Sequence, residues 1–235
     1  ALPLTITALL VPLLASLLGV FSLPQALAPF ANPIIFLFLG GFALAAALHR
    51  QQLDQLLASQ LLRLAAGRLW AAALLLFAAT ALLSMWISNT ATAAMMVPLA
   101  IGLASSQPQP SPVRTFLLLG VAWSASIGGL GTIIGSPPNA IAAAQLQLSF
   151  SDWLWFGLPL VVLLLPLAIA VLYLCLRPVL TQRIQVPAAA AALNASQRLT
   201  LLIFAITVAL WLASRPLAAV LGLAEMDTLV ALLAL

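Results

Sequence analysis

The sequence has 235 residues, of which 65% are hydrophobic and only 5% are charged. Soluble domains have about 25% charged residues, so this composition excludes a soluble protein and indicates an integral membrane protein. The net charge of +4 comes from arginines without any lysine, which bears on membrane topology rather than on nucleic-acid binding. The apolar runs suit membrane helices better than alternating barrel strands, so we expect an all-α polytopic membrane protein.

Residues 1–49 predict two transmembrane helices, at 4–23 and 33–48. Proline and asparagine punctuate the stretch between them, so 24–32 is expected to be a loop.

Residues 50–68 predict an amphipathic helix that lies in the membrane interface instead of spanning it. Leucines recur there at helical spacing, and the opposite face is polar and includes Asp54 and Arg63.

Residues 69–105 predict a re-entrant helical hairpin. A long apolar arm leads to the polar triplet Ser88-Asn89-Thr90, and a second apolar arm of 14 residues follows it. A half-membrane arm needs roughly 10 residues and a full span about 20, so the second arm falls between them. Two short full spans remain the alternative.

Residues 115–148 are too long for one span and are interrupted by four glycines and by Pro137-Pro138. We expect a helix, an unwound segment and a second helix. Open backbone at membrane depth is tolerated only where protein buries it or where it lines a cavity, and in transporters such breaks form ion and substrate sites. Residues 69–148 are therefore expected to carry the ion and substrate sites.

The rest of the chain predicts a transmembrane helix at 151–176, a linker at 177–198, and the start of a second repeat at 199–235. The run TITALL at 5–10 is similar to TLVALL at 228–233. An odd number of crossings separates the two copies, so the second would be inverted, as in many transporters. We expect an inverted-repeat fold, with a second polar tip beyond residue 235.

This layout puts seven of the eight arginines on one side of the membrane. By the positive-inside rule, the loops 50–68, 106–114 and 177–198 are cytoplasmic. Asp152, Arg215, Glu225 and Asp227 are expected on the other side.

The hairpin tip and the broken helix carry oxygen ligands of the kind that bind Na⁺ in transporters. Ser84 and Ser88 are one helical turn apart and should face the same side. Asn89 adds a carboxamide, and the unwound run 128–135 frees backbone carbonyls, including that of Gly135. We expect these groups to form one Na⁺ cage.

The same two motifs predict an anion site. A helix starts at Thr90 or Ala91, and another restarts at Pro137-Pro138-Asn139. Free N–H groups and the positive end of the helix dipole suit carboxylate or sulfate oxygens.

Plainer alternatives remain for individual residues. Ser84 and Thr92 could simply bond back to their own helices, and Gly131 and Gly135 have the spacing of a helix-packing face. His49 is expected at the interface. The six tryptophans lie mostly near segment ends and are interpreted as interface anchors: Trp70, Trp86, Trp123, Trp153, Trp155 and Trp211.

The stretches WISNTATAAMMVP at 86–98, GGLGTIIGSPPN at 128–139 and ANPIIFLFLGGF at 31–42 resemble signatures of the divalent-anion:sodium symporter family, whose members carry dicarboxylates, citrate or sulfate. The resemblance covers essentially the whole chain. It implies a homodimer with scaffold-type helices at 1–49 and the transport domain of a first repeat at 69–148. It also implies elevator-type alternating access, with the helix at 50–67 linking the two domains.

The resemblance also implies roles for single residues. Ser88, Asn89 and Thr90 would touch both sodium and substrate. Ser84 and the Gly135 region would complete the first sodium site. Ser136 and Pro137 would line the substrate side. The second hairpin and its sodium site are absent from this sequence, so we expect a fragment truncated at both ends.

The expected function is sodium-coupled symport of small divalent anions, most simply C4-dicarboxylates, in a bacterial inner membrane. A related anion permease with other coupling, an exchanger or a proton-driven citrate or sulfate carrier, is the alternative. Expected partners are a dicarboxylate or sulfate anion, sodium ions, the lipid bilayer and a second copy of the chain, with no nucleic acid and no cofactor. An intramembrane enzyme would need a serine–histidine pair or two membrane aspartates, and a membrane scaffold has no use for two helix breaks.

Overall fold

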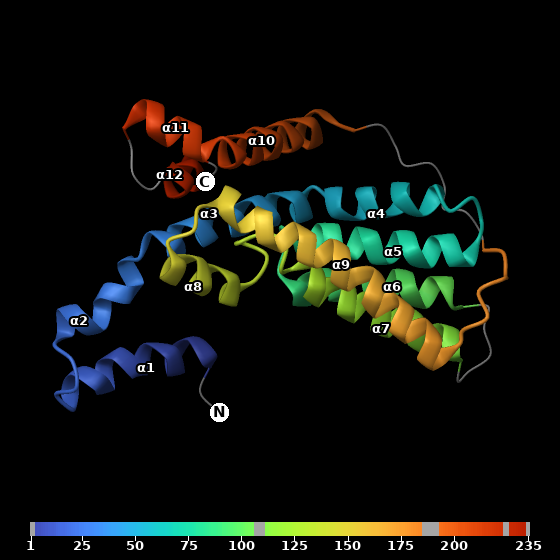
Figure 1. Cartoon of the computed structure of the whole chain (residues 1–235), viewed down its shortest axis with the longest axis horizontal. Coiled ribbons are helices and arrows are strands. Elements are labelled where there is room, and N and C mark those ends of the chain that lie inside the picture. The colour runs from blue at the N-terminus through green and yellow to red at the C-terminus, as the bar shows by residue number, and fades with distance from the viewer. Residues whose placement is uncertain (1–2, 106–110, 185–192, 223–225, 234–235) are drawn as a thin grey trace.

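The computed structural model describes residues 3–105, 111–184, 193–222 and 226–233. Within these ranges, all the named elements of secondary structure are helices (Figure 1). Three of the helices, α3, α9 and α10, are long and apolar enough to cross a membrane, or four spans result if the bent pair α11 and α12 counts as one. The all-α, polytopic class is thereby confirmed. The elements are α1 (Leu4–Leu17), α2 (Leu23–Leu27), η1 (Ala28–Ala31), α3 (Pro33–Arg50), α4 (Leu53–Arg63), α5 (Leu69–Ser84), α6 (Asn89–Leu103), α7 (Pro112–Gly128), α8 (Pro137–Leu146), α9 (Phe150–Leu176), α10 (Ala195–Leu212), α11 (Ser214–Leu221) and α12 (Met226–Leu233).

The N-terminal segment departs from the prediction at two places. The span expected at 4–23 is too long, because Gly19 adopts a φ of +71° just after α1 ends. The loop expected at 24–32 instead contains α2 and the 3₁₀ helix η1, since Ser22 and Gln25 cap the start of α2 reciprocally. In Figure 1, α1 lies apart from the central helices.

The central bundle consists of α5, α6, α7 and α9, with α7 packed against the other three. Its apolar core includes Phe77 and Phe116, whose rings meet edge to face at 5.4 Å. Arms α5 and α6 have 16 and 15 residues, or about 24 and 22 Å at 1.5 Å per residue. Both fall short of the roughly 30 Å hydrocarbon layer, which favours the re-entrant hairpin over two full spans.

Helix α4 packs along α5 (Figure 1). Part of the face that the sequence predicts to be polar is buried in the protein. Asp54 is 1% exposed, so its assignment to a solvated face is wrong. Its carboxylate is nevertheless satisfied, because Oδ2 lies 2.7 Å from Nδ1 of His49 and Oδ1 accepts the N–H of Gln55 at 2.8 Å. His49 thus has a structural contact and is not merely an interface residue.

The expected linker 177–198 ends earlier than predicted. Asn194 and Gln197 form a capping box, so α10 begins at residue 195. Residues 185–192 of the linker, and Glu225 farther along, lie outside the described residues. The linker also pairs with the α4–α5 connection through an isolated antiparallel bridge between Arg68 and Arg183, which brings these two arginines to the same end of the bundle.

A second core joins α3, α8, α10 and α12 to the start of α9. Trp211 is fully buried there and stacks on Phe150 at 4.9 Å. Trp86 packs edge to face on Phe204 at 5.0 Å. The interpretation of Trp86 and Trp211 as interface anchors is therefore wrong, whereas Trp155 is 80% exposed, as an anchor should be.

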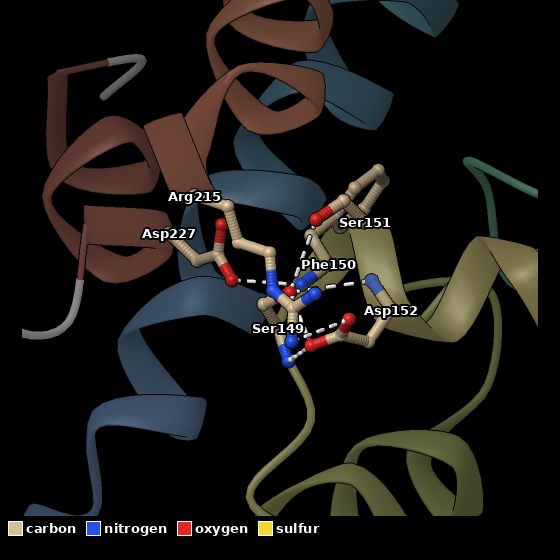
Figure 2. A network of polar contacts seen from close by, with 6 residues as sticks. All are labelled: Ser149, Phe150, Ser151, Asp152, Arg215 and Asp227. Carbon is tan, nitrogen blue, oxygen red and sulfur yellow. Dashed lines mark hydrogen bonds and ion pairs between the residues drawn. The ribbon is translucent and has the colours of Figure 1, made fainter. Parts of the chain in front are cut away.

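A polar network ties the start of α9 to α11 and α12 (Figure 2). Asp152 bonds back to Ser149 and forms an ion pair of 2.9 Å with Arg215. Asp227 accepts the backbone N–H of Phe150 through Oδ2 at 2.7 Å. Asp152, Arg215 and Asp227, which the topology places on one side of the membrane, lie together in this network.

We expect the two contacts of this network to contribute unequally to stability. The Arg215 side chain is 68% exposed, so Arg215→Ala should lower the free energy of unfolding by less than about 1 kcal/mol. Asp227→Ala strands a backbone donor at a helix start and should lower it by about 2 kcal/mol. Thermal unfolding of the purified variants measures both effects. A larger loss of stability in Arg215→Ala than in Asp227→Ala would contradict this ranking of the two contacts.

Candidate functional site

The tip of the α5–α6 hairpin lies against residues 129–136, the segment that joins α7 to α8. Glycines permit this approach. A Cβ on Gly129 would lie 2.2 Å from the carboxamide of Asn89, and one on Gly135 would lie 3.0 Å from the Ser84 carbonyl oxygen. A Cβ on Gly131 would likewise collide with the Met85 side chain. Gly131 and Gly135 therefore permit contact between the hairpin tip and a non-helical segment, and they do not form a helix-packing face.

Oxygen atoms from three segments converge at this contact. Ser84 is buried, and its hydroxyl donates to the carbonyl oxygen of Ala125 in α7 at 2.7 Å. It therefore does not bond back to its own helix. The carboxamide of Asn89 lies 2.8 Å from the Ser84 hydroxyl, 3.2 Å from the Ala125 carbonyl oxygen and 3.3 Å from the Gly135 carbonyl oxygen. All three neighbours are acceptors toward Asn89, so its amide nitrogen faces them.

This arrangement has a clear chemical consequence. A carboxamide that rotates by half a turn presents its oxygen in place of its nitrogen. The Ser84 hydroxyl, the Asn89 carboxamide and the carbonyls of Ala125 and Gly135 would then form a cluster of four oxygens. Such a cluster is unfavourable alone and favourable around a small cation. The expected residues Ser84, Asn89 and Gly135 are thus brought together, and Ala125 is an addition that the sequence did not indicate.

Ser88 occupies a different place from the one predicted. Helix α5 ends at Ser84, so Ser84 and Ser88 do not share a helical face, and the argument from their spacing is wrong. Ser88 is instead the N-cap of α6, and its hydroxyl accepts the N–H of Ala91 at 3.3 Å. Ser88 and Thr90 are both exposed, on the open side of the tip.

The two helix starts offer unequal anion chemistry. The first turn of α6 carries N–H groups beside exposed Ser88 and Thr90. In α8, Pro137 and Pro138 have no N–H, and the N–H of Asn139 bonds to the Ser136 carbonyl at 3.0 Å. The expectation that α8 donates N–H groups is therefore wrong, and α8 can contribute its dipole and the Ser136 hydroxyl, which does not cap the helix.

Three further side chains hold the 129–136 segment in place. Thr132 bonds to the hairpin tip, Asn139 bonds to two carbonyls of the segment, and Nε1 of Trp153 donates to the Leu130 carbonyl at 2.9 Å. Thr132 and Asn139 belong to the 128–139 motif, where a polar side chain in apolar sequence was the available signal. Trp153 was interpreted as an interface anchor, which is wrong because its indole bonds inside the protein.

A cavity of about 450 Å³ lies away from this cluster, between the start of α3, the end of α8, and α11 and α12. Asp227, Arg215 and Ser214 line its polar side. None of Ser84, Asn89 and Gly135 lines it, so the cavity and the oxygen cluster are separate features.

Residues 1–235 match the family model described as CitMHS, citrate transporter, and the chain belongs to this family. An uncharacterized transporter of Haemophilus influenzae is 51% identical over 244 residues, which cover 100% of this chain and 53% of the relative. One of Methanocaldococcus jannaschii is 40% identical over 234 residues, with 100% and 54% covered. The sodium-dependent dicarboxylate transporter SdcS of Staphylococcus saprophyticus is 34% identical over 181 residues, which cover 70% of this chain and 35% of the relative.

These matches confirm the family relationship that the motifs predict. The chain has the helices of a multi-pass membrane protein and belongs to a family of transporters, which are not enzymes. It spans about half the length of the two uncharacterized relatives.

Proposed function

We propose that the protein of which this citrate transporter family chain is part carries small divalent anions together with Na⁺, with C4-dicarboxylates as the preferred substrates. The observation that carries the proposal is the convergence of the Ser84 hydroxyl, the Asn89 carboxamide and the carbonyls of Ala125 and Gly135, which supply four oxygen ligands once the carboxamide rotates. Neutral oxygen ligands of this kind bind Na⁺ in transporters without a buried formal charge.

The cation contributes to anion binding because the site is otherwise uncharged. None of the cluster residues is charged, and none of the residues 69–105 that the hairpin comprises is acidic or basic. A carboxylate about 4 Å from a bound Na⁺ is stabilised by about 4 kcal/mol at an effective dielectric constant of 20. Substrate affinity should therefore depend strongly on sodium, which is the thermodynamic basis of symport.

The open side of the tip supplies the remaining anion contacts. The N-terminus of α6 carries about half a positive charge, and Ser88 and Thr90 add hydroxyls there. Ser136 and Pro137, at the start of α8, directly follow Gly135, which lies against the hairpin tip. Two carboxylates of a C4-dicarboxylate need two such regions, and we assign the second to the part of the full-length protein beyond this chain.

The relatives support both the substrate class and the coupling. SdcS is named as a sodium-dependent dicarboxylate transporter. The family description, citrate transporter, favours a second candidate: a tricarboxylate carrier, driven by sodium or by protons.

The wider mechanism belongs to the same proposal. We place the protein in a bacterial inner membrane as a homodimer, with the loops 50–68, 106–114 and 177–198 in the cytoplasm. Residues 69–148 move against the scaffold helices in an elevator-type cycle, and α4 links the two parts.

Uptake into proteoliposomes that hold the full-length protein tests the proposal. Labelled succinate, citrate and sulfate are each offered under an inward Na⁺ gradient, an inward proton gradient, or neither. We expect succinate uptake that requires Na⁺. Citrate uptake driven by protons alone would favour the second candidate, and uptake indifferent to both ions would contradict coupled transport.

A further inference from the structure

Thr132 makes a bridge between the hairpin tip and the segment that follows α7. Its side chain is buried, with 1% exposure. The hydroxyl donates to the carbonyl oxygen of Met85, in the turn after α5. The hydroxyl oxygen of Thr132 also accepts the backbone N–H of Gly135 at 3.1 Å. One hydroxyl therefore bonds simultaneously to the two parts of the chain that meet at the oxygen cluster.

Asn139 makes a second connection from the start of α8. Its Nδ2 donates to the carbonyl oxygens of Gly129 at 2.7 Å and of Thr132 at 2.8 Å. The side chain is 4% exposed. Both amide hydrogens are used on backbone that no helix stabilises, so the curvature of the 129–136 segment depends on this side chain.

These bonds hold in place the backbone that carries the Gly135 carbonyl. The N–H of Gly135 is bonded to Thr132, while its carbonyl oxygen lies 3.3 Å from the Asn89 amide atom in the oxygen cluster. Gly129, which Asn139 holds, is in contact with the same Asn89 carboxamide. The 129–136 backbone beside the cluster is therefore held by side chains that are not part of it.

We infer that Thr132 and Asn139 are positioning residues that set the affinity of the oxygen cluster for Na⁺ by fixing, before the ion binds, the 129–136 backbone that carries the Gly135 carbonyl. The inference rests on the proposed sodium site. Ligands held in place beforehand lose little freedom on binding, so affinity is gained without a further contact to the ion.

The hydroxyl of Thr132 is the group that matters, which separates positioning from packing. Thr132→Val keeps the shape but removes both hydrogen bonds, and Thr132→Ser keeps the hydroxyl but removes the methyl group. Thr80→Val is the matched control, because Thr80 is equally buried in α5 and bonds only to the Leu76 carbonyl of its own helix, at 2.7 Å.

The measurement is the Na⁺ concentration that gives half-maximal succinate uptake by the full-length protein in proteoliposomes. It is accompanied by the shift in thermal unfolding midpoint between sodium and potassium buffers. Thr132→Val should raise the half-maximal Na⁺ concentration about tenfold and reduce the sodium-induced shift. The factor of about ten corresponds to the net free energy of about one hydrogen bond. Thr132→Ser and Thr80→Val should stay within about twofold of the wild type.

Asn139→Leu repeats the test from the other anchor. It keeps about the size of the side chain, adds no charge near the cation, and removes the donor to the two carbonyl oxygens. We expect a rise in the half-maximal Na⁺ concentration at least as large as for Thr132→Val. If either variant does not fold, as shown by its elution and its unfolding midpoint in potassium buffer, the other decides the question.

The outcomes separate this inference from the proposed function. A wild-type protein without sodium dependence would overturn the proposed function, and the inference with it, before any variant is compared. A sodium-dependent wild type with an unchanged Thr132→Val response would overturn the positioning inference alone. Equal impairment of Thr132→Ser and Thr132→Val would also overturn it, because the methyl group and not the hydroxyl would then matter.

Discussion

The Asn89→Ala variant of the full-length protein is expected to lose sodium-driven uptake of succinate by about 10- to 100-fold. The substitution removes the carboxamide that contacts Ser84, Ala125 and Gly135, and it leaves these buried polar groups without their common partner. Such a loss amounts to about 1–3 kcal/mol, and each 1.4 kcal/mol corresponds to a factor of about ten. Uptake at saturating and at limiting Na⁺ measures the effect.

Asn194→Ala is the control for this experiment. Asn194 caps α10 from an exposed position, where its loss should reduce stability by about 1 kcal/mol and leave the sodium dependence unchanged. Full sodium dependence in Asn89→Ala would remove Asn89 from the cation site.

Gly128→Ala is expected to disrupt the site by a different route. A Cβ at this position would lie 2.3 Å from the carbonyl oxygen and 2.5 Å from the Cα of Ala81, which are backbone atoms that cannot rotate away. Helices α5 and α7 would have to separate, at about 1–3 kcal/mol or more. We expect a lower unfolding midpoint together with loss of uptake that no Na⁺ concentration restores.

Gly102→Ala provides the matched comparison. Gly102 lies in α6 with nothing within 4 Å of its added Cβ, so this substitution should leave uptake intact and add up to about 1 kcal/mol of stability. A normal midpoint and normal uptake in Gly128→Ala would contradict the close approach of α5 and α7.

The sequence was sufficient to predict the features that depend on local breaks in apolar runs. The polar triplet 88–90 interrupts one run and marks the start of the second hairpin arm, and the glycines at 128–135 interrupt another run where the chain leaves the helix. Ser84, Asn89 and Gly135 were expected together, and they lie together. Their roles in binding remain predictions that the experiments above test.

The errors have two physical origins. Capping interactions moved helix boundaries: Ser22 with Gln25 started a helix inside an expected loop, and Asn194 with Gln197 started α10 early. The pattern of hydrophobicity does not register such side-chain bonds to the backbone.

Tertiary contacts caused the other errors. The indole of Trp153 bonds to the 129–136 segment, Trp211 is buried in the second core, and Asp54 is buried beside His49. Each of these partners is distant in sequence or folds back through a turn, so residue type and spacing could not reveal it. Ser84 likewise bonds across to α7, 41 residues away, and not to Ser88.

Simultaneous uptake of radiolabelled sodium and radiolabelled succinate, by proteoliposomes holding the full-length protein, tests the central claim most directly. The account predicts that a gradient of sodium or of succinate drives uptake of the other. Both fluxes should fall together in Asn89→Ala and both should survive in Asn194→Ala. Succinate entry without accompanying sodium, equal in the wild type and in Asn89→Ala, would contradict the assignment of the Ser84–Asn89–Gly135 cluster as the coupling-ion site.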